Sequence, residues 1–161
     1  MSKAPPHKND AVDLLDADHI AVKKLFTEFK KLHEGGASAK KRKALADEIC
    51  RQLTAHTRIE EEIFYPALRG AATQELEDLL DEAEVEHSGA KELIAQLEGM
   101  DGDDGLFDAK VTVLGEYIDH HVKEEREDMF PKARQTGVDL VAMVPVLKER
   151  KEELLAGLAA A

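Results

Sequence analysis

Apolar residues recur at every third or fourth position along most of the chain, the spacing that places them on one face of an amphipathic helix. This pattern defines long segments at about residues 11–33, 39–68, 73–97 and 106–133. Glycine-containing stretches at residues 34–38 and 98–105 interrupt the pattern, and glycine is a common helix stop. No segment alternates apolar and polar residues in the way typical of a strand. The sequence therefore predicts four long helices joined by short loops.

Four such helices indicate an all-α domain, folded as an antiparallel up-and-down four-helix bundle over residues 11–135. Residues 136–161 form a shorter amphipathic segment, in which Pro145 starts or bends the second part. We expect this segment to pack as a helix on the outside of the bundle. Residues 1–10 contain two adjacent prolines among polar neighbours and are predicted to be a disordered tail.

Composition and charge narrow the possible partners. The 34 acidic and 22 basic side chains give a net charge of −12, whereas a nucleic-acid-binding surface is typically basic. No stretch approaches the roughly 18 apolar residues of a membrane span, and the first residues lack the apolar core of a secretory signal. The single cysteine, Cys50, excludes an internal disulfide and suits a reducing compartment. We therefore expect a cytoplasmic protein that binds neither nucleic acid nor membranes.

The second and fourth predicted helices contain two similar stretches, HTRIEEEIFYP (56–66) and HVKEEREDMFP (121–131). In both, glutamate follows the histidine by four residues and proline follows it by ten. Pro66 is expected to kink or close its helix. The first and third helices also match, in DHIAVKKLF (18–26) and EHSGAKELI (86–94). The chain thus repeats a pair of helices, and such a repeat gives a bundle pseudo-twofold symmetry, in which corresponding residues approach one another across the axis.

Histidine and glutamate residues occupy positions on the apolar faces of these helices. Each lies three or four residues from an apolar residue of the same face, so its side chain is directed into the bundle. One histidine comes from each helix, and the second and fourth helices each add a glutamate: His19, His56, Glu60, His87, His121 and Glu125. Imidazoles and carboxylates directed at one interior are candidate metal ligands.

Taken singly, these residues have an ordinary explanation. A lone histidine on an apolar face is more often a hydrogen-bonded interior residue than a ligand, and His-x-x-x-Glu pairs are common on solvated helix faces. The complete set is harder to explain without metal. Burying an unpaired carboxylate costs several kcal/mol, and the apolar faces carry no arginine or lysine as a partner. A pair of divalent or trivalent cations would satisfy the whole set together.

The donor types indicate which metals fit. Imidazole and carboxylate without thiolate suit iron, manganese or zinc rather than Cu(I), and carboxylates from two helices of a bundle are suited to bridge a metal pair. Two octahedral ions offer about twelve coordination positions, of which two bridging glutamates and four histidines fill about eight. A single oxo or hydroxo bridge fills about two more, which leaves room for a small molecule.

The register of the fourth helix leaves one alternative open. The match with the first copy favours His121 with Glu125. The alternative ligand is His120, which lies four residues before Glu124 and five before Glu125. Tyr117 stands one turn before His121, and it either points toward the site or is simply a core residue.

The same residues resemble a known family. The acid-His pair of the first helix, His-x-x-x-Glu-Glu before Phe-Tyr-Pro, Glu-His in the third helix and His-x-x-x-Glu before Phe-Pro are similar to the haemerythrin family, most closely its HHE cation-binding branch. The resemblance covers about residues 11–133. It implies a non-haem di-iron centre that handles dioxygen, nitric oxide or peroxide. It also implies the ligands His19, His56, His87 and His121, with Glu60 and Glu125 bridging two iron ions.

Two departures from the family bear on function. The oxygen-carrying members have a fifth histidine, from a His-x-x-x-His pair in the third helix, whereas Ala83 and Lys91 stand four residues from His87 here. In the fourth helix they have histidine and aspartate five residues apart, whereas His121 and Glu125 are four apart. The missing fifth nitrogen weakens the case for reversible oxygen carriage.

The leading hypothesis is a haemerythrin-like di-iron protein that binds or reacts with small oxidants, in stress protection or sensing. Bound iron would act as an electron donor and Lewis acid, which would allow peroxidase-like, catalase-like or nitric-oxide-handling activity. Two other classes fit the same residues. One is an iron-binding or storage module without turnover, and the other is a metal-free helical scaffold that binds a protein partner.

Overall fold

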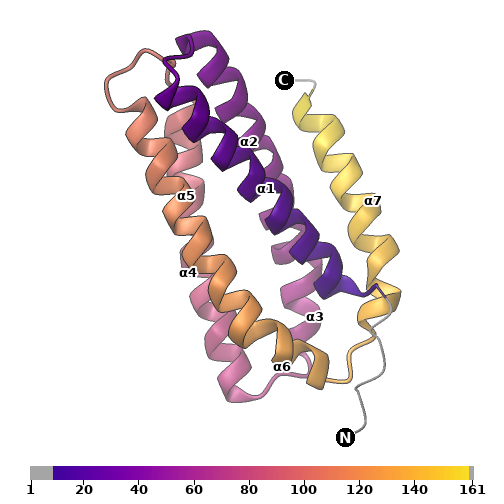
Figure 1. Cartoon of the computed structure of the whole chain (residues 1–161). Helices are drawn as coiled ribbons and strands as arrows, with labels where there is room; N and C mark the ends of the chain where they lie inside the picture. Colours follow the sequence, from indigo (N-terminus) through magenta and orange to yellow (C-terminus); the bar gives the residue numbers. More distant parts are fainter. Residues whose placement is uncertain (1–8, 160–161) are drawn as a thin grey trace, which may run out of the picture.

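The computed structural model describes residues 9–159, and every regular element in this range is helical. Four long helices lie side by side along one direction (Figure 1): α1 (Ala11–Glu34), α2 (Ala39–Ile59), α4 (Gln74–Glu98) and α5 (Phe107–Glu124). α1 packs against α2 and α5, and α4 also packs against α2 and α5, so the four helices enclose a common interior. The predicted helices are thus present, with boundaries within a few residues of those read from the sequence.

α2 and α5 each continue past their α-helical part through a π-helical turn and a short helix. These extensions are η1 (Glu60–Phe64) with α3 (Tyr65–Arg69), and η2 (Glu125–Met129) with α6 (Phe130–Gln135). The last helix, α7 (Leu140–Ala159), packs against α1 and α2. It runs through Pro145 as one helix, so this proline does not start a second part, which was one of the two alternatives suggested by the sequence. None of the described helices has both the length and the apolar character that crossing a bilayer requires.

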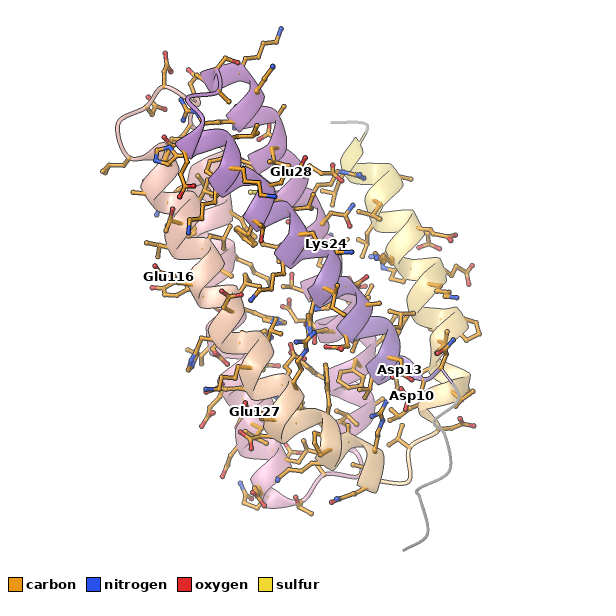
Figure 2. All side chains as sticks on the ribbon, in the orientation of Figure 1. Asp10, Asp13, Lys24, Glu28, Glu116 and Glu127 are labelled. Carbon is orange, nitrogen blue, oxygen red and sulfur yellow. The ribbon has the colours of Figure 1, made fainter. Side chains whose placement is uncertain are left out.

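Asp10 sets the start of α1. Its Oδ1 accepts a hydrogen bond from the Asp13 backbone N–H at 3.0 Å, and Oδ2 of Asp13 accepts from the Asp10 N–H at 3.1 Å, a capping box. Arg134 of α6 donates to both carboxylates, which lie at the start of α1 (Figure 2). Asp10 was assigned to the tail from the sequence, but it belongs to the folded domain. Residues 1–8 of the predicted tail lie outside the described residues.

The two repeated stretches each contain a π turn rather than a helix end. The N–H of Tyr65 donates to the carbonyl of Glu60, and the N–H of Phe130 donates to that of Glu125, in both cases across five residues. A proline follows each turn. Proline has no N–H, and its ring crowds the carbonyl four residues earlier, so a widened turn before it relieves the crowding. The helix therefore continues past Pro66, which excludes an end at this proline, one of the two alternatives suggested by the sequence.

Buried apolar side chains form two clusters, one toward each end of the long helices. The first includes Leu15, Ile59, Phe64, Leu68, Leu80, Ala83 and Phe130. The second includes Val22, Phe29, Ile49, Leu53, Ala90, Phe107 and Leu114. The four predicted histidines lie between these clusters along their helices; His87, for example, stands between Ala83 and Ala90. The fold therefore places polar side chains in a middle layer closed off by apolar layers on both sides.

Candidate metal centre

All the predicted ligand residues meet in this middle layer. They are buried, with exposures from 0% for Glu60 to 6% for His19: His19, His56, Glu60, His87, His121 and Glu125. The middle layer thus brings together donors from α1, η1, α2, α4, α5 and η2. No cysteine joins this set, because Cys50 is buried in the second apolar cluster, where burial raises the pKa of its thiol to about 12.

The histidines form two close pairs, one from each half of the repeat. Nε2 of His19 lies 3.1 Å from Nε2 of His56. Nε2 of His87 likewise lies 3.1 Å from Nε2 of His121. Four imidazoles therefore direct the same ring nitrogen into one space, as the predicted pseudo-twofold relation of the two halves requires.

Each glutamate connects the two pairs through a single oxygen. Oε1 of Glu60 lies 3.0 Å from Nε2 of His56 and 3.4 Å from Nε2 of His87. Oε1 of Glu125 lies 3.5 Å from Nε2 of His19 and 2.6 Å from Nε2 of His121. Both carboxylates thus lie between the halves, which is where a bridging ligand would stand.

The two carboxylates pass a direct test of whether cations fit here. Oε1 of Glu60 and both carboxylate oxygens of Glu125 have no hydrogen-bond partner within the described part of the chain, although both side chains are buried. The imidazole nitrogens are near them, but not in hydrogen-bond geometry. Buried carboxylate oxygens without partners are costly, so they need another source of positive charge. A cation placed among the converging donors would supply it.

The outer ring nitrogens of the histidines face a second layer of carboxylates. Nδ1 of His56 lies 3.0 Å from Asp18; the corresponding distances are 3.3 Å from His87 to Glu61 and 3.3 Å from His121 to Glu86. Nδ1 of His19 lies 3.5 Å from Asp16, without hydrogen-bond geometry. Carboxylates in this position fix the ring so that Nε2 is free to bind metal and make it a stronger donor.

Tyr65 is a site residue that the sequence did not reveal. It is fully buried, and its hydroxyl donates to Oε2 of Glu60 at 3.2 Å and lies 3.4 Å from Nε2 of His87 and 3.5 Å from Nε2 of His121. The π turn places Tyr65 on the inward face, five residues after Glu60. Comparing the repeats could have identified the position, because Tyr65 in the first copy matches Phe130 in the second. In the structure, the ring of Phe130 stacks on the ring of His19.

The open question of register in α5 has a clear geometric answer. His121 and Glu125 point inward with exposures of 5% and 1%, whereas the side chain of His120 is 67% exposed and Glu124 lies beside it. Tyr117 is exposed on the outside of α5, so it is neither a site residue nor a core residue. The exposed His33 lies near the end of α1, 3.1 Å from Asp108.

The carboxylates favour the protonated forms of His56 and His121 when no cation is bound. Burial lowers the pKa of His56, but Glu60 and the other adjacent carboxylate outweigh it and raise the pKa to about 10. Burial likewise lowers the pKa of His121, but Glu125 and its neighbours raise it to about 11. Burial raises the pKa of Glu60, but His56 outweighs it and holds the value well below the usual range. The buried carboxylates therefore favour positive charge at the centre, which protons on the histidines or a bound cation would supply.

One known family matches most of the chain. The sequence model named Hemerythrin HHE cation binding domain matches residues 10–133. The chain belongs to this family. Membership in the haemerythrin HHE family confirms the resemblance read from the repeated motifs, and with the His and Glu clusters it supports a cation-binding function.

Two relatives of this haemerythrin HHE domain are informative. A solved structure of a hemerythrin HHE cation binding domain-containing protein from Mycobacterium kansasii has the same fold, with a TM-score of 0.75 at 22% identity over 93% of this chain and 90% of that one. A DNA nickase of Nostoc sp. (strain PCC 7120 / SAG 25.82 / UTEX 2576) is 30% identical over 126 residues, 76% of this chain. The chain spans about a third of the length of that nickase, since the match covers 33% of it.

Proposed function

We propose that the buried cluster holds two iron ions and that the protein is a non-haem di-iron haemerythrin-like protein that binds or reacts with small oxidants. Under this proposal His19 and His56 hold one ion, His87 and His121 hold the other, and Glu60 and Glu125 are shared. We also propose that the four helices run antiparallel, up and down, and that the protein is located in the cytoplasm. The ligands would be dioxygen, peroxide or nitric oxide, and neither nucleic acid nor membranes would be bound.

The single observation that carries the proposal is the position of the two buried carboxylates, each of which has an Oε1 that is unpartnered within the described residues. Oε1 of Glu60 contacts His56 and His87, one from each half, and Oε1 of Glu125 contacts His19 and His121 in the same way. A site for one ion would need only one half. Carboxylates shared between two nitrogen pairs support two ions, and nitrogen–oxygen donors without thiolate suit iron.

The residues around the centre would bind and shelter its contents. The apolar clusters exclude bulk water on both sides, and the Tyr65 hydroxyl donates a hydrogen bond to Glu60. Access to one side is provided by a groove of about 540 Å³ between α1 and α5, whose lining includes His19, Phe26 and Ile118. When bound, the iron ions supply redox and Lewis-acid chemistry toward a small oxidant.

Metal content and optical absorption test the proposal together. Protein purified after aerobic expression in iron-supplemented medium should contain about two iron atoms per chain, as expected for a two-ion carboxylate site. It should absorb in the near ultraviolet, and the spectrum should change when peroxide or nitric oxide is added. Iron near zero would overturn the proposal. Bound iron with no spectral change and no consumption of peroxide or nitric oxide would favour a storage module instead.

A further inference from the structure

Three of the four carboxylates behind the histidines are paired with a fixed cation of their own. These pairs are Asp16 with Arg126, Asp18 with Lys151, and Glu61 with Lys91. On each of these three sides, a histidine at the centre is followed toward the surface by a carboxylate and then by a lysine or arginine. The outer cation neutralises the carboxylate, so these three sides of the centre need no further positive charge.

The fourth side is different. Glu86 lies 3.3 Å from Nδ1 of His121 through Oε1, and its Oε2 lies 3.7 Å from Nε2 of His120. The same nitrogen of His120 lies 3.1 Å from Oε1 of Glu124. Among residues 9–159, no lysine or arginine nitrogen comes within 4.0 Å of either carboxylate. Two carboxylates and an imidazole therefore stand where the other three sides have a fixed cation.

These three side chains are arranged as metal ligands at an accessible place. One donor atom from each of Glu86, His120 and Glu124 lies within 4.8 Å of the other two. They line a surface hollow of about 780 Å³ between α4 and α5, together with Val85 and Tyr117. Unlike lysine or arginine, a neutral imidazole can donate to a metal ion. A hydrated ion can therefore reach this group from solvent.

The same group is directly connected to the buried centre. Glu86 contacts His120 on the outside and His121 on the inside. A small cavity of about 10 Å³ lies between the surface group and the buried centre, and its lining includes Glu86, Glu124 and Glu125. The carboxylate of Glu125 is 1% exposed and has no hydrogen-bond partner among the described residues. The surface group thus borders the same small cavity as Glu125, whose buried carboxylate has no partner in the part of the chain that the structure describes.

We propose that Glu86, His120 and Glu124 form a surface site for a divalent first-row transition-metal ion, and that this ion is the one taken up into the buried centre. Mixed imidazole and carboxylate donors favour such ions over Mg²⁺ and Ca²⁺, which bind oxygen donors. The bound ion replaces the fixed cation that the other three sides possess. The uptake role rests on the proposed function of the buried centre, whereas the surface site itself does not.

Titration with Mn²⁺, followed by electron paramagnetic resonance, tests the surface site in protein whose buried centre has been filled with iron. Wild-type protein should bind one further Mn²⁺ ion per chain. The double variant His120→Ala/Glu124→Gln should bind it at least about tenfold more weakly, since losing ligands costs at least as much as losing their supporting groups. The control His33→Ala removes an exposed histidine beside an aspartate and should change nothing. Equal Mn²⁺ binding by wild type and the double variant would overturn the site.

Loading kinetics test the uptake role. Metal-free wild type and double variant are mixed with Fe²⁺ under argon, and filling of the buried centre is followed by its absorption after brief exposure to air. The double variant should fill several-fold more slowly and reach the same final content. Equal rates would overturn the uptake role. A wild-type centre that never fills would overturn the proposed function and the uptake role together. The Mn²⁺ titration would then be made on the metal-free protein, and the difference between wild type and the double variant would still decide the surface site.

Discussion

At the scale of single residues, two glutamates stand out by their burial and by oxygens that have no hydrogen-bond partner among residues 9–159. Glu60 and Glu125 are the only carboxylates of the described structure that combine nearly complete burial with unpartnered oxygens. Their immediate neighbours in sequence, Glu61 and Glu124, are partly exposed and face other groups. Adjacent glutamates thus differ in role because successive residues of a helix point about 100° apart.

The first prediction separates these neighbouring glutamates. Glu125→Ala removes an oxygen shared by both histidine pairs, so it should lose both metal ions together, and Glu60→Ala should do the same. Glu124→Ala is the matched control, and it should keep the full content of the buried centre at equilibrium. The measurement is the metal content of protein incubated with excess Fe²⁺ until the content stops rising, so that slower uptake is not counted as loss. Retention of iron by Glu125→Ala, or its loss from Glu124→Ala, would show that the ligand register in α5 and η2 is wrong.

The second prediction concerns Tyr65. Replacing it with phenylalanine removes the hydroxyl that donates to Oε2 of Glu60 and leaves that buried oxygen without its donor. Metal-free Tyr65→Phe should therefore lose about 1–3 kcal/mol of its free energy of unfolding. Tyr117→Phe, at an exposed tyrosine of α5, should change the stability by less than about 0.5 kcal/mol. Urea unfolding of both metal-free variants is the measurement, and equal values would mean that Tyr65 only fills space.

At the scale of elements, the π turns and α7 adapt an ordinary set of helices to this centre. A π turn contains one extra residue, so it rotates everything after it relative to the preceding helix. η1 thereby places Tyr65 over the His87 and His121 pair, and η2 places Phe130 over His19. α7 contributes through Lys151, which pairs with Asp18 behind His56. An element outside the four-helix arrangement therefore supports a predicted ligand.

The third prediction tests this contribution of α7. Lys151→Met keeps the length of the side chain but removes the charge that holds Asp18 against His56. Affinity for metal should fall roughly tenfold, as is typical when a group behind a ligand is lost. Lys148→Met, three residues away on an exposed position of the same helix, should leave the affinity unchanged. Competition with a chelator measures both, and equal affinities would mean that α7 only covers the bundle.

At the scale of the whole molecule, we expect bound cations to add to the stability of the fold, because acidic side chains are buried at its centre. The chain has a net charge of −12 and still buries Glu60 and Glu125 at its centre. We expect the apolar clusters on both sides to keep the helices together without metal. We expect metal to stabilise the middle layer, because an ion that binds only the folded state shifts unfolding by mass action.

The fourth prediction follows from the raised pKa values of His56 and His121. In the metal-free protein, protonated His56 and His121 have folded pKa values of about 10 and about 11, above the ordinary 6.5. Their stabilising effect is therefore complete below about pH 6.5 and is lost as pH rises through about 10 to 11. The melting temperature of the metal-free protein should fall between pH 7 and pH 10.

Metal ions take the place of these protons, so the iron-loaded protein should melt higher than the metal-free one, and the difference should widen as pH rises. Calorimetry of both forms at pH 7 and 9 provides the comparison. Equal melting temperatures of the two forms at neutral pH would contradict the assignment of these side chains to one buried metal centre.

The helical elements, the repeat and the helix face of each ligand candidate could all be predicted from the sequence. These properties are local: a spacing of three to four residues identifies one face of a helix, so His19, His56, His87 and His121 could be placed inward without any contact being known. The repeat did the same for Glu60 and Glu125, and it chose His121 over His120.

Which atoms meet at the centre depends on the packing of the helices and could not be predicted from the sequence. Oε1 of each glutamate touches histidines from both halves because of how four helices pack, and no spacing within one helix specifies that. Tyr65 was missed because the π turn shifts the register by one residue, against the α-helical period used to read the sequence. The pairs behind the histidines, such as Lys151 with Asp18, join residues 133 positions apart. Contacts of that range depend on the packing of whole elements, which a local pattern does not contain.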